Sequence, residues 1–193
     1  MQNVNIMIVG VGGQGTLLAS RILGNAILSV GYDVKVSEVH GMSQRGGSVV
    51  TYVKYGDKVY SPIIDKGEAD IILAFEQLEA LRALPYLKIG GKMIANTQKI
   101  NPMPVITGAA QYPEGILETL ACKVDLTALD ALSIAKAAGN AKAVNVVLVG
   151  IMAKNTNIPY ETWVESVRAC VPAKFLDANL RAFDAGYHYT AEA

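Results

Sequence analysis

Hydrophobic and polar positions follow a strand–helix–strand pattern along the first 40 residues. Residues 4–9 are apolar except for Asn5, as expected of a parallel strand that is buried on both faces. Residues 16–30 carry apolar side chains at helical spacing, and Gly31 stands where a helix-terminating glycine is expected. Residues 33–39 alternate and are rich in valine, which predicts a second strand. The pattern predicts a βαβ unit whose first turn is rich in glycine.

The next segment departs from this simple order. Residues 40–47 form a loop bounded by glycines, and residues 48–55 have the composition of a strand. Gly56-Asp57 predicts a hairpin turn that leads into a further strand at residues 58–60. We expect this β-rich insert to add antiparallel strands to an otherwise parallel sheet.

The alternating order returns near residue 70 and gives way to helices at the C-terminal end. We expect strands at residues 70–75, 92–96 and 123–126, the second after a turn at Gly90-Gly91, an extended loop over 97–108, and helices at 76–87, 113–121, 128–138, 144–154, 160–170 and 174–187. This order of strands and helices predicts one α/β domain over residues 1–193. We expect an open, Rossmann-like, mostly parallel mixed sheet and a helical C-terminal region.

Composition limits the classes of function. The chain has 17 basic and 17 acidic residues, so it has no net charge that would attract nucleic acid or an anionic membrane. Charged residues make up 18% of the chain, against about 25% in typical soluble domains. This shortfall favours a surface that is partly covered by another protein, although a sheet buried on both faces would also lower it. We find no secretion signal and no apolar run of the roughly 20 residues that a membrane span needs, so we expect a cytoplasmic protein.

Cysteine and histidine are scarce. Cys122 and Cys170 are too few for an iron–sulfur cluster, which commonly takes about four thiolates. We expect each to be a small buried apolar residue. With only His40 and His188 besides, the sequence predicts no metal site. It also shows no constellation of acid, base and nucleophile, and we expect no catalytic residue in this chain.

The glycine-rich turn after the first strand is a candidate phosphate site. Gly10, Gly12 and Gly15 have the G-x-G-x-x-G spacing between a strand and a helix. Glycine permits the tight turn, lets a phosphate approach the backbone and lets helix and strand pack closely. The N–H groups of Gly13, Gln14 and Gly15 would then face an anion at the positive end of the helix. A turn needed only for packing is the alternative.

A full dinucleotide site is less favoured by the spacing. Such sites place an acidic residue at the end of the second strand, about 20 residues beyond the glycines. Glu38 lies somewhat farther along. At the start of the helix predicted over residues 76–87, Glu76 and Glu79 are interpreted as charges that complement the helix dipole.

The loop that follows the second strand offers polar side chains beside this turn. Ser43, Gln44 and Arg45 lie between glycines, at the carboxyl end of a strand, where open α/β sheets place their ligands. Hydroxyl, amide and guanidinium groups suit phosphate or carboxylate, which arginine can bind with two hydrogen bonds. A tight turn whose polar groups only cap the local backbone is the alternative.

Together these two segments resemble a known family. The run from Gly10 to Gly15 and the sequence EVHGMSQR at residues 38–45 are similar to the gamma-type domain of 2-oxoacid:ferredoxin oxidoreductases. Within this family, they most resemble the small (beta) subunits of the indolepyruvate-specific enzymes. The similarity continues at residues 69–76, 79–82, 145–150 and 171–172 and covers nearly the whole chain. The resemblance implies that thiamine diphosphate and iron–sulfur clusters lie on a larger alpha-type partner, that ferredoxin is met through the complex, and that coenzyme A is a possible ligand of this chain.

We therefore expect the small subunit of a thiamine-diphosphate-dependent 2-oxoacid (indolepyruvate or aryl pyruvate):ferredoxin oxidoreductase, which supports oxidative decarboxylation to an acyl-coenzyme A. We expect a hetero-oligomer with the large subunit and a homodimer when the chain is isolated. A stand-alone nucleotide-binding oxidoreductase and a non-enzymatic ligand sensor are the alternatives. Several aromatic side chains near the C-terminal end serve either the core or a partner, namely Tyr160, Trp163, Phe183, Tyr187 and Tyr189.

Overall fold

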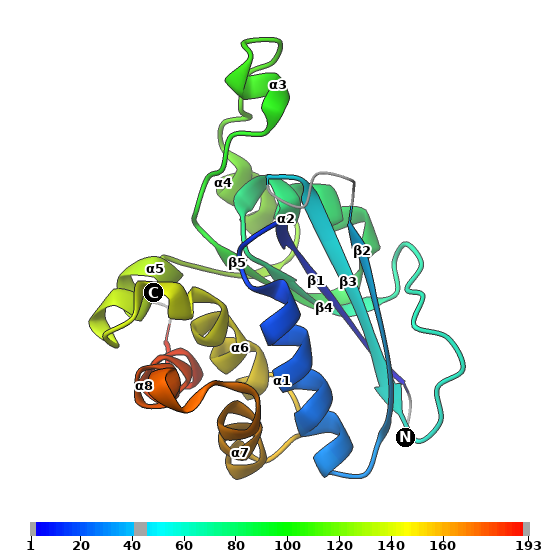
Figure 1. Cartoon of the computed structure of the whole chain (residues 1–193). Helices are drawn as coiled ribbons and strands as arrows, with labels where there is room; N and C mark the ends of the chain where they lie inside the picture. The colour runs from blue at the N-terminus through cyan, green and yellow to red at the C-terminus, as the bar shows by residue number, and fades with distance from the viewer. Residues whose placement is uncertain (1–2, 41–45, 191–193) are drawn as a thin grey trace.

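The structure, a computed structural model, describes residues 3–40 and 46–190. Within them, six strands form one sheet in the order β2-β3-β1-β4-β5-β6 (Figure 1). β1 pairs in parallel with β4, β4 with β5, and β5 with β6, whereas β3 is antiparallel to both β1 and β2. The expected mostly parallel, Rossmann-like sheet with an antiparallel insert is confirmed. The strands are β1 (Val4–Val11), β2 (Asp33–His40), β3 (Ser48–Gly56), β4 (Ala69–Ala74), β5 (Leu87–Asn96) and β6 (Asp125–Leu129).

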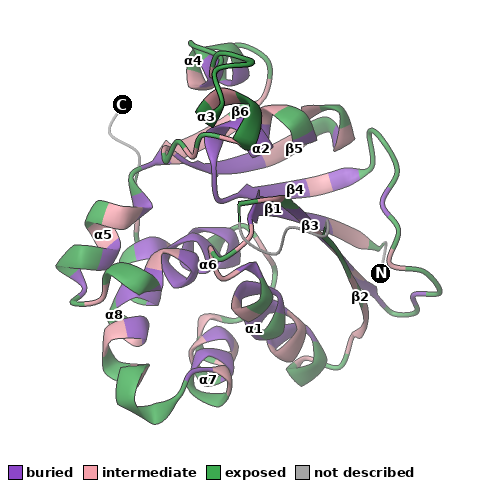
Figure 2. Ribbon diagram, turned by 45° about the horizontal axis from the view of Figure 1, so that its top comes forward, coloured by how far each residue is buried: buried purple, intermediate pink, exposed green. Residues whose placement is uncertain are grey.

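Helices cover both faces of this sheet (Figure 2). Because both faces are covered, β1 is apolar on each side, with Ile6 and Ile8 in one core cluster and Met7 and Val9 in the other. No helix of the described residues is both long enough and apolar enough to cross a membrane. One face carries α1 (Thr16–Ser29), α5 (Ala131–Ala137), α6 (Val144–Lys154), α7 (Tyr160–Cys170) and α8 (Leu176–Tyr187), and the other carries α2 (Gln77–Ala83) and α4 (Ile116–Ala121).

The antiparallel insert differs from the sequence prediction. The predictions of a hairpin turn at Gly56-Asp57 and of a strand at residues 58–60 were wrong. β3 is paired with β1 along one edge and with β2 along the other, so neither edge is open to a further strand. Residues 58–60 leave the sheet instead, and the N–H of Val59 donates to Oδ2 of Asp33 at 2.9 Å.

The Gly90-Gly91 pair lies inside β5 and does not form the predicted turn. The pairing between β4 and β5 shifts register between Ala69 and Ile71, which marks a bulge. A Cβ on Gly91 would stand 3.0 Å from the carbonyl oxygen of Ala69, so glycine here allows two backbones to approach. The turn prediction failed because glycine inside a strand can mark a bulge.

Other boundaries move by a few residues. β6 starts two residues later than predicted, and α5 begins at Ala131 because the carboxylate of Asp130 accepts the N–H groups of Leu132 and Ser133 at 3.1 and 3.0 Å. α2 is shorter than predicted and continues as a 3-10 helix. The expected burial of both cysteines is wrong, since one is exposed and the other half-buried. The 3-10 helices are Leu84–Tyr86, Ala141–Ala143 and Ala173–Phe175, and a short helix, α3 (Met103–Ile106), interrupts the predicted extended loop.

The helix α6 is the centre of the C-terminal region. Its residues from Asn145 to Ala153 are all buried. α8 crosses it at close range through Gly150 and Gly186, since a Cβ on Gly186 would lie 2.1 Å from the carbonyl oxygen of Val147. Such close contact with a backbone carbonyl is possible because Gly186 carries no side chain.

The aromatic residues beside this crossing belong in part to the core. The rings of Trp163 and Phe183 are fully buried and stack with centroids 6.5 Å apart. Tyr160 lies against Phe183, with the ring centroids 5.9 Å apart, and its hydroxyl donates to Asp184. Trp163 of α7 and Phe183 of α8, which are both fully buried, therefore hold the two helices together.

Candidate functional site

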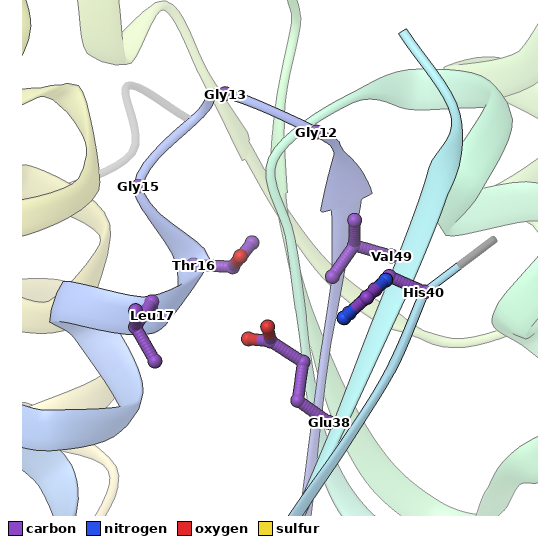
Figure 3. Close-up of a pocket in the computed structure, with 8 residues that line it drawn as sticks. All are labelled: Gly12, Gly13, Gly15, Thr16, Leu17, Glu38, His40 and Val49. Carbon is purple, nitrogen blue, oxygen red and sulfur yellow. The ribbon is translucent and has the colours of Figure 1, made fainter. Parts of the chain in front are cut away.

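A cavity of about 400 Å³ opens beside the glycine turn. It lies between the end of β1, the first turn of α1, the end of β2 and the start of the antiparallel strand β3 (Figure 3). Ligands of open α/β sheets bind at this carboxyl end of the strands. The lining residues are Gly12, Gly13, Gly15, Thr16, Leu17, Glu38, His40 and Val49.

The glycine turn contributes Gly12, Gly13 and Gly15 to the lining of this cavity. Gly13 and Gly15 have φ angles of 100° and 85°, in the left-handed region that glycine adopts readily. Gly15 is also the N-cap of α1 and provides no side-chain cap. Within the described part of the chain, the N–H groups of Gly13 and Gly15 have no acceptor. These groups, with the positive end of the helix dipole, suit an anion.

Two other members of the predicted site serve the turn itself. The N–H of Gln14 donates to the carbonyl of Val11 at 3.2 Å, and its side-chain oxygen accepts the N–H of Val11 at 2.7 Å. The side-chain nitrogen of Gln14 donates to the carbonyl of Phe75 at 3.0 Å and to Gln98 at 3.1 Å. The N–H of Gly12 donates to the carbonyl of Gly47 at 2.9 Å. Gln14 therefore locks the turn to the end of β4.

The close packing around the turn also explains its glycines. A Cβ on Gly10 would stand 3.0 Å from Cβ of Phe75, and a Cβ on Gly15 would stand 2.7 Å from Nδ2 of Asn145. Nδ2 of Asn145 donates to the carbonyl of Gly15 at 3.2 Å. Asn145 is buried at the start of α6. Its role was missed in the sequence, because the two residues lie 130 positions apart.

Glu38 faces the same cavity, although its spacing from the glycines argued against a ligand role. Figure 3 shows its carboxylate directed from β2 toward Thr16 and Leu17 in the first turn of α1. Glu38 pairs with Thr51 of β3, whose hydroxyl donates to the carboxylate at 3.3 Å. An acceptor at this position can bind ribose hydroxyls, as in Rossmann sites. Glu38 was discounted on its spacing alone, and spacing does not show that the end of β2 and the first turn of α1 line one cavity.

Ser43, Gln44 and Arg45 lie outside the described residues. The described end of that loop does reach the turn, through the hydrogen bond from Gly12 to Gly47. The two glycine-bearing segments singled out in the sequence are therefore neighbours in the fold.

A second cavity, of about 220 Å³, lies near the end of β1 and is lined by two buried carboxylates. Glu76 caps α2 by accepting the N–H of Glu79 at 3.0 Å, which agrees with the predicted helix-start role. It also accepts the N–H of Ile100 at 3.1 Å and the hydroxyl of Tyr112. Burial, together with this hydrogen bond to Glu76, raises the pKa of Tyr112 well above its usual range.

The second carboxylate has different partners. Glu79 accepts the hydroxyl of Ser48 at 2.5 Å and Nη1 of Arg82 at 2.6 Å. Neither carboxylate belongs to a metal-binding cluster, because residues 3–40 and 46–190 place no group of three or more His, Cys, Asp or Glu side chains to hold an ion. The polar network of this cavity joins the start of β3, α2 and the segment after β5.

Over almost its whole length the chain is similar to known oxidoreductases. The family model described as pyruvate ferredoxin/flavodoxin oxidoreductase matches residues 5–189. This chain belongs to that family. The indolepyruvate oxidoreductase subunit IorB of Pyrococcus horikoshii is 46% identical over 96% of this chain and 95% of its own length. The resemblance proposed from the two loops is thereby confirmed, as is the assignment to an oxidoreductase of the 2-oxoacid family.

Solved structures show the same fold in this family. The gamma subunit of a keto/oxoacid ferredoxin oxidoreductase from Geobacter sulfurreducens matches with a TM-score of 0.72 and 25% identity, over 95% of this chain and 96% of that one. The 2-oxoglutarate:ferredoxin oxidoreductase of Magnetococcus marinus, solved with 2-oxoglutarate, coenzyme A and succinyl-CoA bound, matches with a TM-score of 0.71 and 20% identity. The match covers 97% of this chain but 31% of that one, so there the fold is part of a longer chain.

Proposed function

We propose that this chain is the small subunit of a cytoplasmic, thiamine-diphosphate-dependent 2-oxoacid:ferredoxin oxidoreductase that acts on an aryl 2-oxoacid such as indolepyruvate. The observation that carries the proposal is the 46% identity to an indolepyruvate oxidoreductase subunit, which extends over nearly the full length of both chains. The enzyme supports oxidative decarboxylation of the 2-oxoacid to an acyl-coenzyme A.

The catalytic cofactors are assigned to a larger alpha-type partner. Thiamine diphosphate and the iron–sulfur clusters lie there, and ferredoxin is reduced through the complex. The longer chain of the 2-oxoglutarate enzyme, of which this fold makes up 31%, supports a division of labour in which the domain works beside further protein. The role of this chain is to bind and orient a ligand at its glycine turn.

Coenzyme A is the proposed ligand of that turn. The N–H groups of Gly13 and Gly15 would bind its phosphates, beside the turn closed by Gly12 and Gln14. Ser43, Gln44 and Arg45 follow β2 in the sequence, and Arg45 is proposed to add a charge-assisted hydrogen bond. The coenzyme bound in the 2-oxoglutarate enzyme gives the proposal its chemical class.

One observation favours a second ligand for the same cavity. The carboxylate of Glu38 points into it (Figure 3). A carboxylate binds free ribose hydroxyls but repels a phosphorylated ribose. Coenzyme A carries a phosphate on the 3′-hydroxyl of its ribose, whereas ADP and dephospho-coenzyme A leave both the 2′- and the 3′-hydroxyl free. The second candidate is therefore a nucleotide whose ribose 2′- and 3′-hydroxyls are free, such as ADP.

The variant Glu38→Gln separates the two ligands. If a free ribose is bound, loss of the charged acceptor removes a hydrogen bond of roughly 1.5–3 kcal/mol, and ADP or dephospho-coenzyme A binds about tenfold or more weakly. If coenzyme A is bound, the variant removes a repulsion and its affinity stays equal or rises. Calorimetric titration of all three ligands measures the difference. Glu161→Gln, on the exposed start of α7, is the charge-matched control and leaves every affinity unchanged.

Association with the partner tests the proposed function. Mixing this chain with the large subunit of the enzyme is expected to give one stable hetero-oligomer, whose mass light scattering measures. A stable interface of this kind typically buries about 800 Å² or more on each partner. The isolated chain is proposed to form a homodimer, because exposed apolar side chains and low charge leave surface to cover. If the large subunit does not bind this chain at micromolar concentration, the proposed function is contradicted.

A further inference from the structure

Residues 99–114 form an arm that projects from one end of the sheet and is attached to it at the base (Figure 1). Figure 1 shows α3 at the end of this arm, beyond the carboxyl ends of the parallel strands. Its side chains are mostly exposed (Figure 2), and those of Met103 and Ile106 are 63% and 64% exposed. Between Lys99 and Glu114 the arm has no charged residue. An uncharged element with apolar side chains at its tip is typical of a protein contact.

The arm is built as an ordered structure. At its base one buried carboxylate fixes both ends, because Glu76 accepts the N–H of Ile100 at 3.1 Å and the hydroxyl of Tyr112. At its tip the N–H of Ile106 donates to the carbonyl of Pro102 at 3.1 Å, and the N–H of Ala110 donates to that of Pro104 at 3.0 Å. A preformed arm loses little conformational entropy on binding. Glu76, interpreted in the sequence as a helix-dipole residue, is thus also the anchor of the arm.

The position of the arm indicates its partner. Ile100, Pro102 and Met103 line the same cavity as Gly46 and Gly47, at the end of the sheet that carries the glycine turn. A protein that meets the candidate site therefore also meets the arm. A second copy of this chain on the arm would instead hinder access of the large subunit to that end.

We infer that residues 99–114 are a docking arm whose tip, Met103, Val105 and Ile106, inserts into an apolar groove on the large subunit. The inference rests on the proposed function, which supplies that subunit. The arm places the glycine turn and its ligand against the partner and makes the complex specific through shape and apolar burial.

The double variant Met103→Ser with Ile106→Ser tests the arm. Both side chains are exposed, so the thermal midpoint of the isolated chain stays unchanged. Its affinity for the large subunit is expected to fall by roughly tenfold or more, because apolar anchors carry much of an interface's binding energy. Self-association of the isolated chain is expected to stay as in the wild type. Surface plasmon resonance with immobilised large subunit, together with light scattering, measures both.

The matched control is Tyr60→Ser with Ile63→Ser. These side chains are 88% and 61% exposed but follow β3, at the opposite end of the sheet, and affinity for the large subunit stays within twofold. An arm variant that binds the large subunit as tightly as the wild type overturns the inference. So does one that loses only self-association, which would make a second copy the occupant. A wild-type chain that fails to bind the large subunit contradicts the proposed function itself, and the arm with it.

Discussion

The variant Gly186→Ala is expected to lose roughly 3 kcal/mol or more of the free energy of unfolding. The added Cβ would lie 2.1 Å from the carbonyl oxygen of Val147 and 2.9 Å from its carbonyl carbon. Both atoms are backbone, and they belong to the buried helix α6. A side chain could rotate away, but here the two helices must separate and open the core between α6 and α8.

Chemical denaturation followed by circular dichroism measures this loss. The control is Gly24→Ala in α1, which is also a helical glycine, but its added Cβ meets nothing within 4 Å. That variant is expected to gain about 0.5–1 kcal/mol, because alanine has the higher helix propensity. If Gly186→Ala is as stable as the wild type, α6 and α8 do not cross as closely as these distances indicate.

The variant Gly15→Ala is expected to abolish ligand binding at the glycine turn. Gly15 has a φ of 85°, and an L-residue in the left-handed region costs roughly 1–2 kcal/mol. Its Cβ would also stand 2.7 Å from Nδ2 of Asn145. The start of α1 must shift to relieve both effects, which moves the N–H groups that would hold a phosphate. Calorimetric titration with coenzyme A and with ADP measures the loss.

A glycine with the same φ provides the control for this variant. Gly31 also has a φ of 85°, but an added Cβ there meets nothing within 4 Å, and the residue lies beyond the other end of α1. Gly31→Ala is expected to lose stability by the backbone cost alone and to keep full affinity for the ligand. Equal loss of affinity in the two variants would mean that binding follows global stability rather than the geometry of the turn.

The sequence was sufficient where the determinants are local. β1, the glycine turn and α1 were predicted correctly, because an apolar run, a glycine spacing and a helical period each occupy consecutive residues. The neighbourhood of the two loops was also predictable, since both follow strands at the same end of the sheet. The bond from Gly12 to Gly47 agrees with this expectation.

What the sequence missed depends on contacts between distant segments. β3 pairs with β1 and β2 rather than with residues 58–60, a choice made by the whole sheet. Gln14 is held by Phe75, and Gly15 by Asn145, at separations of 61 and 130 residues. The sequence of the arm has no helical or strand periodicity that would predict an ordered structure. Its order depends instead on hydrogen bonds to the carboxylate of Glu76.

The central claim is that this chain is a subunit whose activity depends on a larger partner. Ferredoxin reduction driven by indolepyruvate and coenzyme A tests it most directly, measured for this chain, for the large subunit and for their mixture. We predict that the isolated chain is colourless and inactive, and that the mixture forms the acyl-coenzyme A faster than the large subunit alone. Turnover by this chain without the partner, or a large subunit that gains nothing from the chain, would contradict the account.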